Sequence, residues 1–202
     1  MRKKKLLFVT EWHKLSTGYA TYTKNLLSRL YKTGKYDIIE LASYGSQQDP
    51  KLNEGVPWKV IGNNPLSKEE EQAYHSNPVN QLGAFRFNDV AINEMPDCVL
   101  DFRDEWYFSY EGTSILRPNY HWIVQPTVDA VPQAENWQFT FSLADHILTY
   151  TDFGKRTLES VGFKNVRGVA FLGADFETFF PHKDKKAVRQ FYGVDPNINL
   201  IG

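Results

Sequence analysis

The sequence predicts an α/β fold, a Rossmann-like parallel sheet with helices on both faces. Two observations predict it: short apolar runs of strand length alternate with segments whose apolar residues recur every three or four positions, and capping residues, glycine or proline flank many of the helical segments. Such alternation requires right-handed crossovers and a parallel sheet covered on both sides. With 202 residues, the chain suffices for one such domain but not for two full ones.

Seven segments are predicted to be strands. Each is a predominantly apolar run of strand length, and most lie between turn signals or helical patterns. In chain order they span residues 6–10, 36–44, 56–61, 97–102, 120–124, 146–150 and 166–171.

Helices are predicted around these strands from apolar residues at spacings of three and four. The first shows the pattern most clearly, because its apolar face repeats at Tyr19, Tyr22 and Leu26. Ser67 would cap the second helix, whose first turn is rich in glutamate. The predicted helices span residues 19–34, 67–74, 84–94, 134–144 and 152–162, and a linker helix follows over residues 182–192.

The last quarter of the chain carries the most specific pattern. Residues 144–162 contain Ala-Asp, an apolar strand, Thr-Asp-Phe-Gly, a helix and a final Gly, and residues 172–181 are Leu-Gly-Ala-Asp-Phe-Glu-Thr-Phe-Phe-Pro. This order resembles the end of the N-terminal domain of GT-B glycosyltransferases of the retaining family 4, or group 1, type. The resemblance covers most of the chain in layout, and it is specific over residues 144–181.

The resemblance implies an enzyme that transfers a sugar from a nucleotide-diphosphate sugar to an acceptor hydroxyl, with retention and without a required metal. Its active site would lie between two Rossmann-like domains. Residues 1–181 would be the acceptor-side domain, and residues 182–202 the linker and the start of a C-terminal donor-binding domain, with 197–201 as its first strand. Because that second domain holds most of the donor in this family, the chain alone is expected to be inactive.

The candidate site residues follow the first, fourth and fifth strands, since a ligand lies beyond the carboxyl ends of the strands in an open parallel sheet. After the first strand, Ser16, Thr17 and Gly18 precede a helix whose N-terminus favours an anion. The resemblance implies that this loop meets the donor diphosphate or sugar, and the alternative is a plain N-cap. His13 is an acceptor-side candidate, although a surface loop position explains it more simply.

After the fourth strand, Asp104 is a second catalytic candidate, because a carboxylate can orient a sugar by accepting hydrogen bonds from its hydroxyls. The alternative is a surface ion pair with Arg103, which would contribute little. Asp101 and Glu105 are weaker candidates. Trp106 could stack on an acceptor sugar ring, although core packing explains it equally well.

After the fifth strand, Gln125 is an acceptor-side candidate and Asp129 is the main catalytic candidate. Some members of the family have Pro-x-Asp-Gly here, and the resemblance implies that Asp129 contacts the reacting hydroxyl. Ala130 replaces the glycine and no histidine occurs in this segment, so a mechanism with a histidine base is in doubt. The alternative role for Asp129 is an N-cap for the helix after Pro132.

Composition argues against several other classes. A net charge of −1 gives no reason to expect nucleic acid as a partner. Five histidines without ligand spacing and a single Cys98, expected to be an inert core thiol in a reducing cytoplasm, predict no metal site and no cofactor. No apolar run is long enough to span a membrane, so the basic residues 2–5 predict at most a peripheral attraction to one.

Two rival functions remain open. One is a non-catalytic Rossmann-like module that binds a sugar or a nucleotide. The other is a GT-B-like sugar-nucleotide epimerase, which would act on the donor without an acceptor. The resemblance further implies that the final helix of a full-length member packs back on this domain. The absence of that helix should expose an apolar surface, so a homodimer through that surface is expected.

Overall fold

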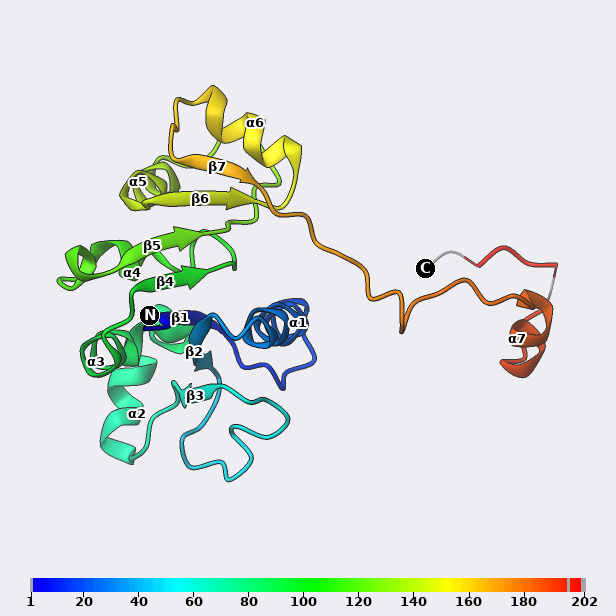
Figure 1. The fold of residues 1–202 in the computed structure, drawn as a ribbon, viewed down its shortest axis with the longest axis horizontal. Coiled ribbons are helices and arrows are strands. Elements are labelled where there is room, and N and C mark those ends of the chain that lie inside the picture. The colour runs from blue at the N-terminus through cyan, green and yellow to red at the C-terminus, as the bar shows by residue number, and fades with distance from the viewer. Residues whose placement is uncertain (1, 196, 201–202) are drawn as a thin grey trace. The chain divides into compact units, whose positions relative to one another are not determined.

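The computed structural model of the chain describes residues 2–195 and 197–200 and contains the predicted parallel sheet (Figure 1). Seven strands join in the order β3-β2-β1-β4-β5-β6-β7, and every neighbouring pair is parallel. All seven predicted strands and the α/β fold class are confirmed. The strands are β1 Lys4–Glu11, β2 Tyr36–Ser43, β3 Lys59–Gly62, β4 Cys98–Asp101, β5 His121–Val124, β6 His146–Thr149 and β7 Val166–Val169.

The five predicted helices around the sheet and a helix within residues 182–192 are also confirmed, whereas the linker role of the latter stays a prediction. The sequence does not predict the short elements α4, η1 and η2, which have three to five residues and show no apolar periodicity. No helix among the described residues is long and apolar enough to cross a bilayer. The helices are α1 Gly18–Lys32, α2 Lys68–His75, the π-helix η1 Asn80–Ala84, α3 Phe85–Glu94, α4 Ser109–Thr113, the 3-10 helix η2 Arg117–Asn119, α5 Glu135–Leu143, α6 Asp152–Ser160 and α7 Lys185–Phe191.

Local side-chain chemistry sets several element bounds. Thr17, Ser67 and Thr151 each accept a hydrogen bond from the backbone N–H three residues ahead, at 3.2, 3.4 and 3.0 Å, and so cap α1, α2 and α6. The third strand starts at Lys59, later than predicted. Pro57, which has no N–H to donate to a ladder, lies just before this start.

The core occupies both faces of the sheet because successive residues of a strand point to opposite sides. Leu7 and Val9 of β1 belong to a cluster on one face that includes residues of α3, α5 and α6. Leu6 and Phe8 pack on the other face with Leu27 of α1. Helices on both faces are therefore confirmed. A ligand can approach such a sheet only at the ends of its strands.

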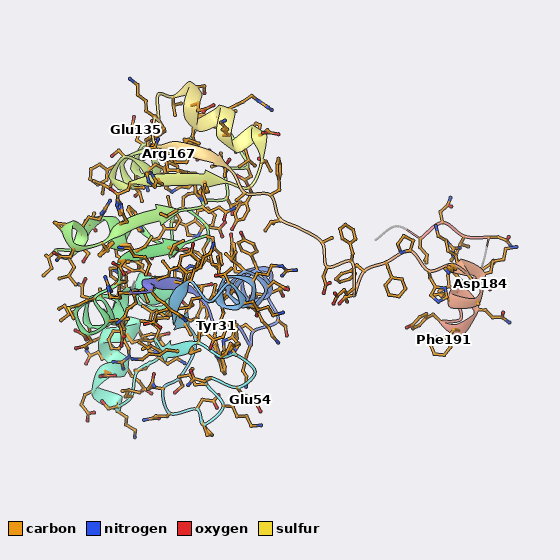
Figure 2. All side chains as sticks on the ribbon, viewed as in Figure 1. Tyr31, Glu54, Glu135, Arg167, Asp184 and Phe191 are labelled. Atoms are coloured by element: carbon orange, nitrogen blue, oxygen red, sulfur yellow. The ribbon has the colours of Figure 1, made fainter. Side chains whose placement is uncertain are left out.

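Residues 172–202 form a contact unit of their own, distinct from residues 1–171. The predicted strand over 197–201 is wrong for residues 197–200, which adopt no strand because no described segment pairs with them; residue 201 lies outside the described residues. Several apolar side chains of this unit are exposed, among them Phe191, which Figure 2 labels. The others are Leu172, Phe176, Phe179, Phe180, Tyr192, Ile198 and Leu200.

Substituting Gly112 in α4 should destabilise the sheet domain. A Cβ added at Gly112 would lie 2.5 Å from the Trp122 ring, which is fully buried. We expect Gly112→Ala to lower the free energy of unfolding by about 1–3 kcal/mol, the usual cost of overpacking a core. Urea unfolding measures the loss. The control is Gly168→Ala, where a Cβ meets no atom within 4 Å; equal stability of the two variants would contradict this account.

Candidate functional site

The candidate site lies at the carboxyl ends of β1 and β4. From β1 the strand order continues to β2 and β3 in one direction, and from β4 to β7 in the other, so these two strands flank the switch point of the sheet. Because all strands are parallel, their carboxyl ends meet at the same edge (Figure 1). The loops after β1, β4 and β5 supply the side chains described below.

Three side chains from three segments are hydrogen-bonded at this edge. The Tyr19 hydroxyl, at the start of α1, donates to Asp104 Oδ1 at 2.7 Å and lies 3.0 Å from Thr127 Oγ1. Burial raises the pKa of the Tyr19 phenol, and the Asp104 carboxylate adds to the rise, so the phenol keeps its proton. Asp104 is therefore held in place by a tyrosine, and the surface ion pair with Arg103 considered as its alternative is not formed.

Glu105 is buried next to Asp104, with 2% of its surface exposed. Its Oε2 atom has no hydrogen-bond partner in the described part of the chain. Burial, aided by the charges of Asp104 and Asp129, raises the pKa of the Glu105 carboxyl from 4.5 to about 7. The sequence ranks Glu105 below Asp104 because nothing in the local pattern signals burial of this side chain. A carboxyl with such a pKa can exchange a proton near neutral pH.

Asp129 is exposed to solvent in the segment that follows β5. The N-cap of α5 is Ala134, without a side-chain capping bond, so the alternative role of Asp129 as a cap is wrong. The charge of Asp129 acts on Glu105 together with that of Asp104. The structure thus brings the two predicted catalytic candidates together around Glu105, while their contact with a substrate stays a prediction.

Aromatic side chains border these carboxylates. Trp106 is 51% exposed; its ring lies 5.8 Å from that of Trp137 and 5.9 Å from that of Tyr107, measured between centroids. We call these three residues the aromatic ledge. An exposed indole face suits stacking on a sugar ring or contact with a cation, in line with the acceptor-side role predicted for Trp106.

The loop after β4 is anchored by a buried ion pair. Arg103 Nε donates to Asp101 Oδ1 at 3.0 Å, and Nη2 donates to Oδ2; both side chains are fully buried. Arg103 Nη1 also donates to Ser43 Oγ at 3.0 Å and to Leu82 O at 2.8 Å. The expectation of a surface position for Arg103 is wrong, because its partner is the preceding strand residue and its side chain turns inward.

His13 is not on the surface. Its side chain is 1% exposed, with Nδ1 3.0 Å from Glu40 Oε2 and Nε2 3.3 Å from Glu54 O. The backbone N–H of His13 and the indole N–H of Trp58 also donate to Glu40. The His13 ring therefore contacts a buried carboxylate of β2, and both ring nitrogens have a partner. The structure gives His13 a structural role, and a contact with an acceptor stays a prediction.

Gln125 is also buried rather than open to an acceptor. Its Oε1 accepts a hydrogen bond from the Tyr22 hydroxyl at 3.2 Å, and its Nε2 donates to Ala170 O at 2.8 Å. The side chain joins the end of β5 to α1 and to the residue after β7. Its partners are distant in sequence, which is why the sequence alone does not reveal this role.

At the N-terminus of α1, Thr17 acts as the cap. Its hydroxyl accepts from Ala20 N at 3.2 Å and donates to Glu11. Glu11 therefore places a carboxylate near the helix end where a donor diphosphate is predicted, and such a charge disfavours a second anion. Gly18 is open, since a Cβ there would meet no atom within 4 Å, and Ser16 is exposed.

Metal-binding and thiol chemistry find little support at this edge. Within the described residues, no three or more His, Cys, Asp and Glu side chains form a group that could hold a metal ion. Cys98 is buried in β4, and burial raises the pKa of its thiol to about 12. The prediction of an inert core thiol is confirmed.

The fold is similar to solved structures of GT-B proteins. Sucrose-phosphate synthase from Thermosynechococcus elongatus matches with a TM-score of 0.67 at 14% identity, over 97% of this chain and 54% of that one. UDP-N-acetylglucosamine 2-epimerase from Rickettsia bellii matches with a TM-score of 0.59 at 13% identity, over 96% of this chain and 52% of that one. The chain thus spans about half the length of these proteins. No family profile and no curated protein matches its sequence, so the likeness establishes a GT-B-like fold and nothing further.

The raised pKa of Glu105 should appear in the pH dependence of stability. The folded protein keeps this proton up to about pH 7, whereas the unfolded chain releases it near pH 4.5. Relative to Glu105→Gln, which cannot titrate, the wild type should therefore lose about 1–3 kcal/mol of stability as the pH rises through this interval.

Urea unfolding across this interval measures the difference between the two proteins. The control is Glu135→Gln, which makes the same substitution at an exposed carboxylate in the first turn of α5. A constant difference for Glu105→Gln would contradict the raised pKa.

Proposed function

We propose that the protein is a glycosyltransferase that moves a sugar from a nucleotide-diphosphate sugar to an acceptor hydroxyl, with retention, and that this chain is its acceptor-side half. The observation that carries the proposal is the cluster of Asp104, Glu105 and Asp129 at the switch point, bordered by the aromatic ledge. Carboxylates that accept hydrogen bonds from hydroxyls, together with exposed aromatic faces, suit a sugar-type acceptor. The resemblance of residues 144–181 and the GT-B-like fold support the reaction class.

In this proposal the exposed Asp129 orients the reacting hydroxyl. The hydroxyl oxygen bonds to the anomeric carbon of the donor, the bond from that carbon to phosphate breaks, and an oxygen of the departing diphosphate takes the proton. Asp104, held by Tyr19, orients a second hydroxyl of the acceptor. A second domain holds most of the donor, and Gly18 lets the donor sugar approach the backbone of α1.

A sugar-nucleotide epimerase is the second candidate. The observation in its favour is Glu105, whose pKa of about 7 suits a group that gives and takes protons during isomerisation. Conversion of the nucleotide sugar without any acceptor would favour the epimerase. Conversion that requires an acceptor would favour the transferase.

Replacing Gly18 should weaken donor binding without loss of stability. Gly18→Ala adds a methyl group where the protein leaves open space, so only a bound ligand would meet it. We expect binding of UDP-glucose or GDP-mannose to weaken about tenfold, and urea unfolding to show equal or slightly higher stability.

Calorimetry with both nucleotide sugars, on this chain and on the product of the complete gene, measures the effect. Tight binding only by the complete product would support a site shared with a second domain. Equally tight binding by this chain would overturn the half-site proposal, and an unchanged affinity of Gly18→Ala would remove Gly18 from the donor site.

Replacing Asp129 should slow the transfer step. Asp129→Asn keeps the size of the side chain but removes the charge that orients the hydroxyl, so kcat of the complete gene product should fall about 100-fold with little change in KM for the donor. Release of the nucleotide diphosphate measures the rate. The control is Asp37→Asn, an exposed residue of β2 near its amino end. Full activity of Asp129→Asn would exclude the residue from the reaction.

A further inference from the structure

Four carboxylates at the switch point have no cationic partner. Glu11, Asp104, Glu105 and Asp129 form no ion pair within the described part of the chain. The charges of Asp104 and Asp129 act on Glu105. Burial raises the pKa of the Tyr107 phenol, and the charges of Asp104 and Glu11 raise it further. The charges of Glu11, Asp104 and Asp129 therefore act on neighbouring groups at this edge.

Several carboxylates at other places in the sheet domain are paired. Asp101 bonds to Arg103, Asp145 lies 2.8 Å from Arg117, and Asp97 lies 2.7 Å from an arginine at the N-terminus. Asp37, Asp89 and the buried Glu111 also form no ion pair among the described residues, so the switch-point set is distinguished by its members lying near one another at one edge. Its innermost member, Glu105, is 98% buried and has an oxygen without a hydrogen-bond partner among the described residues. A buried polar atom of this kind is costly unless a ligand or a solvent molecule satisfies it.

A bare metal ion does not fit this cluster. A metal needs several ligand atoms converging at one point, and no described group of three or more acidic, histidine or cysteine side chains offers that. A larger organic cation can instead meet carboxylates that are spread over a wider area. The exposed indole of Trp106 in the aromatic ledge adds the second element of such a site, because an indole face attracts cations. Tyr44, 40% exposed after β2, adds a further phenol to the same edge.

We propose that the acceptor is a cationic polyol, an amino sugar or a related hydroxylated amine, whose ammonium group lies among these carboxylates while its ring lies on the aromatic ledge. The inference rests on the proposed function, since it names the class of the acceptor. It also accounts for Glu11 beside the N-terminus of α1, where a carboxylate opposes an anion and attracts a cation.

The test compares two disaccharides that differ in charge. The protein is titrated at pH 6 by calorimetry with the disaccharide of glucosamine, which carries ammonium groups, and with its fully N-acetylated form, which is neutral. The charged disaccharide should bind at least tenfold more tightly at low salt, and added salt should reduce the preference. Equal binding, stronger binding of the neutral form, or no binding of the charged form would overturn the inference.

Matched variants identify the surface. The double variant Asp104→Asn with Asp129→Asn should abolish the preference, whereas Asp37→Asn with Asp89→Asn, two exposed carboxylates elsewhere, should retain it. Trp106→Ala should weaken binding of both disaccharides, and Tyr31→Ala, which removes a partly exposed aromatic near the end of α1, should not. Retention of the preference in the first double variant would overturn the assignment to this edge.

Donor turnover by the complete gene product separates this inference from the proposed function. Transfer to neutral acceptors with no gain for amines would overturn the cationic acceptor and leave the transferase in place. A charge preference in binding without any turnover of nucleotide sugars would support the cation site and overturn the transferase.

Discussion

The buried guanidinium of Arg103 forms hydrogen bonds to three separate segments of the chain. The candidate site depends on these bonds, because they fix the loop that carries two of its carboxylates. The guanidinium bonds to Asp101 at the end of β4, to Ser43 at the end of β2 and to the carbonyl of Leu82 in η1. A buried arginine without its carboxylate would be strongly unfavourable, so the pair holds the chain in one arrangement. Asp104 and Glu105 follow Arg103 directly in the sequence, so the buried ion pair also fixes the positions of these two residues.

The anchor explains why side chains in a loop can act as a defined set. Tyr107 lies against Arg103, whose guanidinium carbon is 5.4 Å from the ring centroid, and the Tyr19 hydroxyl at the start of α1 donates a hydrogen bond to Asp104. Sites need such support to keep reacting groups in a productive geometry. The switch point thus combines carboxylates of fixed position with a tryptophan, Trp106, that is exposed.

Much of the fold can be predicted from local patterns, and much of the site cannot. Strand lengths, helical spacing and the caps Thr17 and Thr151 act within a few residues, so the sequence shows them directly. The partners of His13 and Gln125 lie 27 and 45 residues away, and no periodicity predicts such pairs. Asp104 and Asp129 are found from their place after strands. Glu105 becomes a strong candidate only once the structure shows that its side chain is buried.

Because the pKa of the Glu105 carboxyl is about 7, the binding of a charged ligand at this edge and the protonation of Glu105 are coupled. A positive charge that arrives nearby favours the ionised carboxyl and expels the proton, whereas a negative charge favours uptake of one. The heat of association therefore contains a contribution from the buffer that exchanges this proton. The apparent affinity for a charged ligand therefore also varies with pH near neutrality, in opposite directions for cationic and anionic ligands. This dependence requires no conformational change of the protein.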